Sequence, residues 1–267
     1  MRSARRALLA ALLPTAARAQ TAELVPTDAL RVCADPANLP FSNERGEGFE
    51  NRIAEIVAEA LRLPLRYVFF PQIHGFVRNT LGAGRCDLVM GTVAGDEVMQ
   101  NTTPYYHTTY VMAFRSGGDR PPEDFADLRM RTLRFGVVAR TPPTDILARH
   151  GLLDRTRPYP LVVDTRHDAP GAQMMRDVAS GEIDVGLIWG PIAGYAIKVN
   201  HLPLALQPLR GEPGATRMDF RITMGVRANE PEWRRRINAA IRDHQAEITA
   251  VLQEYGVPLL DASGRLQ

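Results

Sequence analysis

Polar, acidic and aromatic residues gather directly after the first predicted strand. The segment 33–43 reads Cys-Ala-Asp-Pro-Ala-Asn-Leu-Pro-Phe-Ser-Asn. In open parallel sheets, the loops at the carboxyl ends of strands carry binding sites. Asp35 and Asn38 offer hydrogen bonds there, and Phe41 offers apolar contact. The same composition is typical of a Pro-rich turn in which Asp and Asn cap backbone groups, so both interpretations stay open at this point.

Other candidate residues follow later strands and helix starts. A helix beginning near residue 49 would present free backbone N–H groups, which suit anionic or carbonyl ligands. Hydrogen bonds are expected from Asp35, Asn38 and Gln72, apolar contact from Phe41 and Trp189, and contact with an anion or an acidic partner from Arg78 and Arg140. The complete expected binding surface is Asp35, Asn38, Phe41, Glu50, Gln72, Arg78, Thr92, Arg140, Thr141 and Trp189.

The sequence gives little support to an enzyme. It contains no G-x-S-x-G, H-E-x-x-H, G-x-x-x-x-G-K or G-x-G-x-x-G motif. His74 and His107 are too few for a zinc site, which needs three or four ligands, so no metal site is expected. A dehydratase would need a cleft acid of perturbed pKa, for which Asp35 and Glu50 are the candidates. We therefore expect a protein that acts by binding, without catalytic residues or a cofactor of its own.

The elements that would position these residues alternate between strands and helices. This order predicts an α/β fold with mostly parallel sheets. Strands are expected at 30–34, 65–70, 87–90, 108–114, 135–138, 161–163, 183–189 and 220–226. Helices are expected at 49–61, 76–83, 172–179, 192–198 and 232–255, the last with a break near residue 244, and a further helix opened by Thr141-Pro142.

The first 19 residues predict export. Three Arg precede an apolar run at 7–13, and Ala17-Arg18-Ala19 is a signal-peptidase site, so we expect cleavage after Ala19. The run is far shorter than the roughly 20 residues of a membrane span, which argues against an anchor. Without this segment the chain has 28 basic and 30 acidic residues, a net charge of −2. That charge balance excludes nucleic-acid binding through a basic face, and we expect a periplasmic protein without stable membrane insertion.

The two cysteines pose a separate question. Export to an oxidising compartment favours a disulfide. If the strands around Cys33 and Cys86 are neighbours with level ends, however, the residues are offset by three positions, about 10 Å. A disulfide needs Cα atoms within roughly 7 Å. On this register the bond is slightly disfavoured.

Five segments together resemble the family 3 extracellular solute-binding proteins of ABC importers. They are R-V-C-A-D-P at 31–36, G-F-E-N at 48–51, C-D-L-V-M-G at 86–91, P-Y-Y at 104–106 and G-E-I-D-V-G-L-I-W-G-P at 181–191. The resemblance implies an α/β, two-lobed type II periplasmic binding protein fold with two hinge strands. It also implies a first lobe at 20–113 and 212–267, and a second lobe at 114–211.

A narrower resemblance is to the subgroup associated with PQQ-dependent quinoprotein dehydrogenases, the J proteins of methanol-oxidation operons. It is carried by the strings at 33–43, 46–54, 71–81 and 188–195. Amino-acid binders of the larger family usually have T-x-E-R after the third strand and an Asp where this chain has Trp189; here residues 92–97 contain no Arg. Loss of both charge clamps would weaken zwitterion binding.

The narrower resemblance implies a periplasmic protein that assists maturation or activation of a PQQ-dependent methanol or alcohol dehydrogenase by binding it. The alternative is an importer component that captures a small polar solute by lobe closure. A wide apolar cleft would favour the first function, and a tight pocket with matched charges the second.

Overall fold

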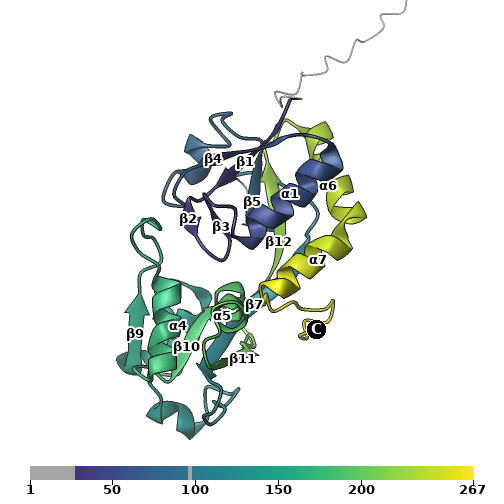
Figure 1. Ribbon diagram of the computed structural model, residues 1–267. Coiled ribbons are helices and arrows are strands. Elements are labelled where there is room, and N and C mark those ends of the chain that lie inside the picture. Colours follow the sequence, from purple (N-terminus) through teal and green to yellow (C-terminus); the bar gives the residue numbers. More distant parts are fainter. Residues whose placement is uncertain (1–27, 96–97) are drawn as a thin grey trace, which may run out of the picture.

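The computed structural model describes residues 28–95 and 98–267. The chain forms two lobes, each with its own hydrophobic core, and strands that pass between them (Figure 1). The expected signal peptide at 1–19 lies outside the described residues. The expected two-lobed α/β fold is confirmed.

The first lobe is built on the sheet order β4-β1-β5-β12, in which β1 pairs in parallel with β4 and β5, and β12 is antiparallel to β5. Its elements are β1 (Leu30–Ala34), β2 (Ala37–Asn38), β3 (Ser42–Asn43), α1 (Phe49–Leu61), β4 (Leu65–Phe69), α2 (Phe76–Asn79), β5 (Leu88–Val93), β6 (Gln100–Asn101), β12 (Asp219–Val226), α6 (Pro231–Asp243) and α7 (Gln245–Glu254).

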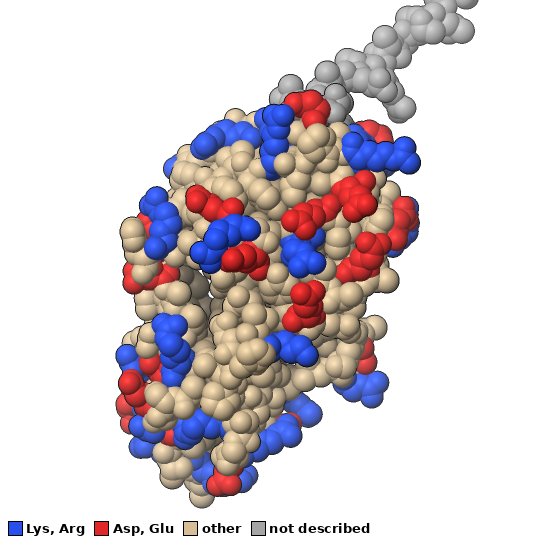
Figure 2. Space-filling view, viewed as in Figure 1, with Lys and Arg blue, Asp and Glu red and all other residues tan. Residues whose placement is uncertain are grey.

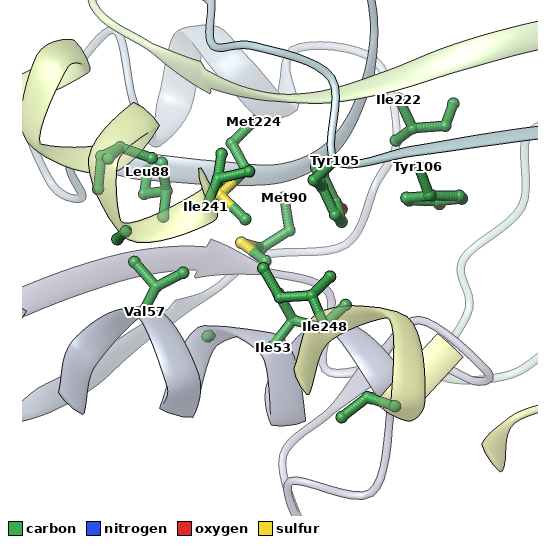
Figure 3. Packing of buried hydrophobic residues seen from close by; sticks show 14 of the residues in the cluster. Ile53, Val57, Leu88, Met90, Tyr105, Tyr106, Ile222, Met224, Ile241 and Ile248 are labelled. Atoms are coloured by element: carbon green, nitrogen blue, oxygen red, sulfur yellow. The ribbon is translucent and has the colours of Figure 1, made fainter. Parts of the chain in front are cut away.

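Helix α1 forms because its apolar residues recur at helical spacing and meet the sheet. Ile53 and Val57 are fully buried against β5 and β12, as Figure 3 shows. Burial of each such side chain contributes about 1.5–3 kcal/mol. The Asn51 side chain accepts hydrogen bonds from the backbone N–H groups of Asn43 and Gly48 (3.0 and 3.1 Å), so it fixes the helix start against the loop that precedes it. This packing sets where the 35–43 loop stands.

The second lobe is built around β10, which pairs in parallel with β8 and antiparallel with β7. Its elements are two 3₁₀ helices (Leu128–Thr132 and Leu153–Arg155), β8 (Phe135–Val138), α3 (Pro142–Arg149), β9 (Thr156–Tyr159), α4 (Pro170–Ser180), β10 (Val185–Trp189), α5 (Gly190–Lys198) and β11 (Leu204–Pro208).

Strand β7 (Tyr106–Arg115) connects the lobes. Residues 106–109 pair with β12, whereas residues 110–115 pair with β10 and β11. The returning chain lies beside the same point, because Tyr110 N–H donates to Met218 O and Tyr110 O accepts from Leu209 N–H, both at 2.9 Å. The lobe boundaries at 113/114 and 211/212 stay a prediction.

The expectation of mostly parallel sheets was wrong, since four strand pairs among the described residues are parallel and six are antiparallel. Two predicted elements also differ clearly from the structure. Residues 161–163 form a loop, because Leu161 and Val163 face the space between the lobes instead of a neighbouring strand. The strand lies earlier, at β9, where Pro158 is tolerated because β9 is an edge strand that pairs only with β8. The helix expected at 76–83 is also shorter, since α2 ends at Asn79.

The prediction about the cysteines was wrong: Cys33 and Cys86 form a disulfide, with Cα atoms 5.5 Å apart. The expected offset is present, because Cys33 lies opposite Val89. Strand β5, however, begins only at Leu88, and the chain bends at Asp87. Extended geometry therefore does not apply at Cys86, and the bend brings it back to β1.

Candidate functional site

A cleft of about 440 Å³ lies between the lobes. Figure 2 shows the surface hollowed there, with charged side chains of both signs spread over the two lobes around it. The loops that follow β1 and β4, with the end of β5, form one wall, and the 160–169 loop with the start of α4 forms the other. Among the described residues that line it, Asp168 is the one charged side chain. The cleft is thus apolar and nearly without charge.

Aromatic rings form the inner end of the cleft, beside the crossing strands. Trp189 ends β10 and lies directly opposite Tyr110 of β7 in the sheet register. Phe220 of β12 completes the group, with ring centroids 5.0 Å (Tyr110–Trp189), 5.9 Å (Trp189–Phe220) and 6.3 Å (Tyr110–Phe220) apart in edge-to-face contacts. Burial raises the pKa of Tyr110 to about 12, so its hydroxyl stays uncharged. Such a wall suits a planar or apolar group.

The Asp35 carboxylate organises the mouth of the cleft. The side chain is fully buried and accepts hydrogen bonds from Ala37 N–H (2.9 Å), Gln72 N–H (2.6 Å) and the Thr165 hydroxyl (2.7 Å). Thr165 belongs to the second-lobe loop that rises towards β2 in Figure 1. Asp35 therefore joins two loops of the first lobe to the second lobe. Because both carboxylate oxygens accept hydrogen bonds from the protein, Asp35 has a structural role in the site.

Glu50 is buried behind the first-lobe wall. Its exposed fraction is 6%, and burial, with a smaller contribution from the nearby Asp35 carboxylate, raises its pKa to about 8. The carboxyl points at Gly91, which lines the cleft: a Cβ at Gly91 would stand 2.1 Å from Glu50 Oε1. Glu50 is therefore a neutral acid at pH 7, separated from the cleft by one glycine.

The structure separates the expected site residues into two groups. Asn38, Phe41, Gln72, Thr141 and Trp189 line the cleft. Asn38 Nδ2 donates to Gln72 Oε1 (2.9 Å), which ties two of these residues to each other. The Thr141 hydroxyl donates to Val138 O (2.6 Å).

The remaining residues do not line the cleft. Besides Asp35 and Glu50, Thr92 is buried and bonded to Thr223 (2.9 Å between the hydroxyl oxygens), while Arg78 and Arg140 are exposed outside it. Sequence reasoning missed Tyr110, Thr165 and Phe220. Tyr110 and Phe220 lie on the predicted strands 108–114 and 220–226, and their place where strands cross between the lobes could have identified them as cleft residues. Thr165 had no such signal, because its partner is 130 positions away.

A second groove of about 700 Å³ adjoins the cleft. It runs between the 36–45 loop and helices α4 and α5. The residues that line both spaces are Ala37, Leu39, Ala169, Ala172 and Ile192. The concave surface between the lobes is therefore longer than the cleft alone.

Within the described part of the chain, no cluster of three or more His, Cys, Asp or Glu side chains is arranged to hold a metal ion. His107 Nε2 instead lies 2.7 Å from Asp219 Oδ1. The described helices also include none with the length and apolar character needed to cross a membrane.

Two lobes joined by crossing strands, with a cleft between them, define a binding protein of the periplasmic type. The chain belongs to the bacterial extracellular solute-binding proteins, family 3, whose sequence model matches residues 30–257.

Three relatives are particularly similar. Protein MoxJ of Methylorubrum extorquens AM1 is 32% identical over 267 residues, covering 93% of this chain and 88% of MoxJ. Protein MoxJ of Paracoccus denitrificans is 27% identical over 254 residues, covering 90% and 92%. The crystal structure of the periplasmic binding protein XoxJ from Methylobacterium extorquens AM1 is 40% identical, with a TM-score of 0.74, covering 87% of this chain and all of that one. This protein is thus a MoxJ- and XoxJ-like member of the family.

Proposed function

We propose that this protein is a periplasmic partner of a PQQ-dependent methanol or alcohol dehydrogenase and assists its maturation or activation by binding. The proposal combines the similarity to MoxJ and XoxJ with the resemblance of segments 33–43, 46–54, 71–81 and 188–195 to the J proteins of methanol-oxidation operons. Cleavage after Ala19 would release the chain into the periplasm.

One observation supports this function above the others: the cleft is apolar and lacks charged clamps. No Lys or Arg lines it among the described residues. The resemblance to amino-acid binders implies that Trp189 replaces their Asp. A zwitterion would find no pair of opposite charges there. An apolar segment of a protein partner would find aromatic contacts and, beyond them, the adjoining groove.

The test is deletion of the gene in a methylotrophic host that carries it, followed by an assay of dye-linked alcohol dehydrogenase activity per unit of dehydrogenase protein. We expect the dehydrogenase to be present but poorly active, and the purified mature protein to restore it. Unchanged specific activity in the deletion strain would refute the proposal.

An importer component that captures a small solute is the second candidate. The observation that favours it is the Thr165–Asp35 hydrogen bond, which joins the two lobes across the mouth of the cleft as in a closed binding protein. A thermal-shift screen of small polar solutes separates the two functions. Saturable stabilisation by one solute supports import, and its absence, together with dehydrogenase activation, supports the first proposal.

The third candidate, a dehydratase, would use Glu50 or Asp35 as its acid. Asp35 has its carboxylate oxygens engaged by three donors, so the acid beside Glu50 is not free to take part in proton transfer. We propose action by binding and not by catalysis.

A further inference from the structure

The first-lobe wall of the cleft includes Gly91, which has no side chain to cover the group behind it. Strands β5 and β12 change register here: Thr92 lies opposite Thr223, but Val89 lies opposite Gly225. Gly91 has a φ of +66°, as a glycine in a β-bulge does, and bulges are frequent beside functional sites. Since any Cβ at this position would collide with Glu50 Oε1, only glycine allows the carboxyl to stand directly behind the wall.

The Glu50 carboxyl is an unpartnered polar group. It is 94% buried, from its exposed fraction of 6%, and no protein group among the described residues hydrogen-bonds to its side chain, although its oxygens are not among the completely enclosed polar atoms that lack a partner. Tyr105 Oη is buried without a hydrogen-bond partner, and the Tyr105 ring lies directly before β7, beside Met90, the neighbour of Gly91 (Figure 3). Buried polar groups in folded proteins are nearly always paired with protein or water, so a carboxyl without a protein partner beside a cleft is able to hydrogen-bond to a ligand.

The groups that face Glu50 keep this corner uncharged, apart from Asp35. Burial raises the pKa of Glu50 to about 8, so the neutral acid, which carries an O–H donor, predominates at pH 7. The tyrosines packed around it are Tyr67 on β4, Tyr105 directly before β7 and Tyr106 on β7. Burial raises their pKa values, so they remain neutral as well.

The aromatic inner end of the cleft limits what can be bound. Trp189, Tyr110 and Phe220 offer ring faces and edges to a planar apolar group. An anion would meet Asp168, and no Lys or Arg lines the cleft among the described residues to balance its charge. An uncharged ligand with a planar apolar group and a hydrogen-bond acceptor fits the aromatic inner end and the Glu50 carboxyl.

We propose that Glu50, reached past Gly91, forms a hydrogen-bonding subsite of the cleft that takes the carbonyl oxygen of an uncharged, planar, apolar ligand. This inference deepens the proposed use of the cleft as a binding surface. It concerns the chemistry that the cleft accepts, whichever larger molecule carries the carbonyl group.

Three probes with the same ring system test the subsite by calorimetric titration at pH 6.5: 2-acetylnaphthalene, 2-ethylnaphthalene and 2-naphthoate. We expect the ketone to bind about tenfold more tightly than the ethyl compound, which has no acceptor, and more tightly than the anion. Trp189→Leu should lower the affinity for the ketone and for the ethyl compound by a similar factor, which would show that both bind in the cleft.

Two variants of Glu50 locate the hydrogen bond. Glu50→Gln keeps an N–H donor and should keep the preference for the ketone. Glu50→Leu removes the donor and should abolish that preference while leaving the affinity for the ethyl compound unchanged. An equal preference for the ketone in Glu50→Leu, or no binding of the ketone to the wild type, overturns the proposal.

A measurement that does not need Glu50→Leu covers the case in which that variant fails to fold. The infrared carbonyl band of a protonated carboxylic acid should be present at pH 6.5, be absent from Glu50→Gln and move when the ketone binds. A band that the ketone does not move overturns the subsite. These readouts do not involve the dehydrogenase, so a failure here leaves the proposed function standing, and failed activation would leave the subsite standing.

Discussion

Single side chains show how similar residue types take different roles in this protein. Asp35 and Glu50 are both acids beside the cleft, and both are buried. Asp35 is surrounded by hydrogen-bond donors, which stabilise a carboxylate. Glu50 has no such donors, and its burial favours the neutral acid. The two acids therefore differ through their partners, which the residue type does not reveal.

Glu50 makes a pH-dependent contribution to stability. The unfolded chain releases its proton near pH 4.5, whereas the native state keeps it up to about pH 8. Because the native state then binds more protons than the unfolded state, the free energy of unfolding falls as pH rises between these values, by up to about 1.4 kcal/mol per pH unit. Below pH 4.5 both states are protonated, and above about pH 8 the loss is complete.

Glu50→Gln removes this titration. We expect urea unfolding at pH 5, 6.5, 8 and 9 to show the variant gaining stability relative to the wild type from pH 5 to 8, and no further gain at pH 9. A difference between the two proteins that stays constant over this range would contradict a raised pKa for Glu50.

At the scale of elements, the disulfide holds β1 to the chain that leads into β5. It closes a loop across a sequence separation of 53, for which loop-closure entropy gives a stabilisation of about 4 kcal/mol. We expect the Cys33→Ala/Cys86→Ala double variant to lose about 2–4 kcal/mol in urea unfolding under oxidising conditions. Under reducing conditions the wild type should lose a similar amount, and the variant should not change. Equal stability of the two oxidised proteins would contradict this role.

Helix α5 of the second lobe meets the chain that follows α7 of the first lobe at very close range. A Cβ at Gly194 would stand 1.8 Å from Gly256 O, and Tyr195 stacks on Tyr255 with centroids 6.1 Å apart. Glycine is needed at 194 because backbone meets backbone there, and neither side can yield as a flexible side chain could.

Gly194→Ala should therefore destabilise the protein by about 1–3 kcal/mol in urea unfolding, because the added methyl group forces the two lobes apart at this contact. Gly117→Ala is the matched control: nothing lies within 4 Å of its added Cβ, so a change within about 0.5 kcal/mol is expected. A Gly194→Ala protein as stable as the control would show that the lobes are not held at this point.

At the scale of the whole molecule, the relative position of the lobes depends on contacts between segments distant in the sequence. The Thr165–Asp35 hydrogen bond spans the mouth of the cleft, and the α5 contact lies beside the crossing strands. The Thr165–Asp35 hydrogen bond can break without disturbing either core, since Asp35 keeps its two backbone donors in its own lobe.

We expect Thr165→Val to shift the protein towards a more open arrangement, visible as an increase in the radius of gyration by small-angle X-ray scattering. Thr249→Val is the control, because its hydroxyl bonds to Gln245 O within α7 and no lobe contact is lost. Identical scattering from the wild type and both variants would show that this hydrogen bond does not hold the cleft closed.

The amino-acid sequence by itself determined most elements of the fold. The helical spacing of apolar residues predicts α1 with its observed bounds, and β1 and β8 agree in the same way. The local pattern suffices for these elements because the buried face of a helix or strand appears in the sequence as a regular spacing of apolar residues. Prediction from the local pattern failed at 161–163, because these apolar residues face the cleft and form no strand, and at Cys86, because the chain bends before the strand begins.

The tertiary structure alone decided which side chains are free to bind. The sequence placed the candidate residues near strand ends and helix starts. It could not show that Thr165 hydrogen-bonds to Asp35 or that Thr223 hydrogen-bonds to Thr92. It also could not show that the Glu50 carboxyl lies directly behind Gly91. Whether a polar group already has a hydrogen-bond partner depends on neighbours that lie 41 to 131 positions away along the chain. Such pairings arise only when the sheet and the lobes bring those segments together.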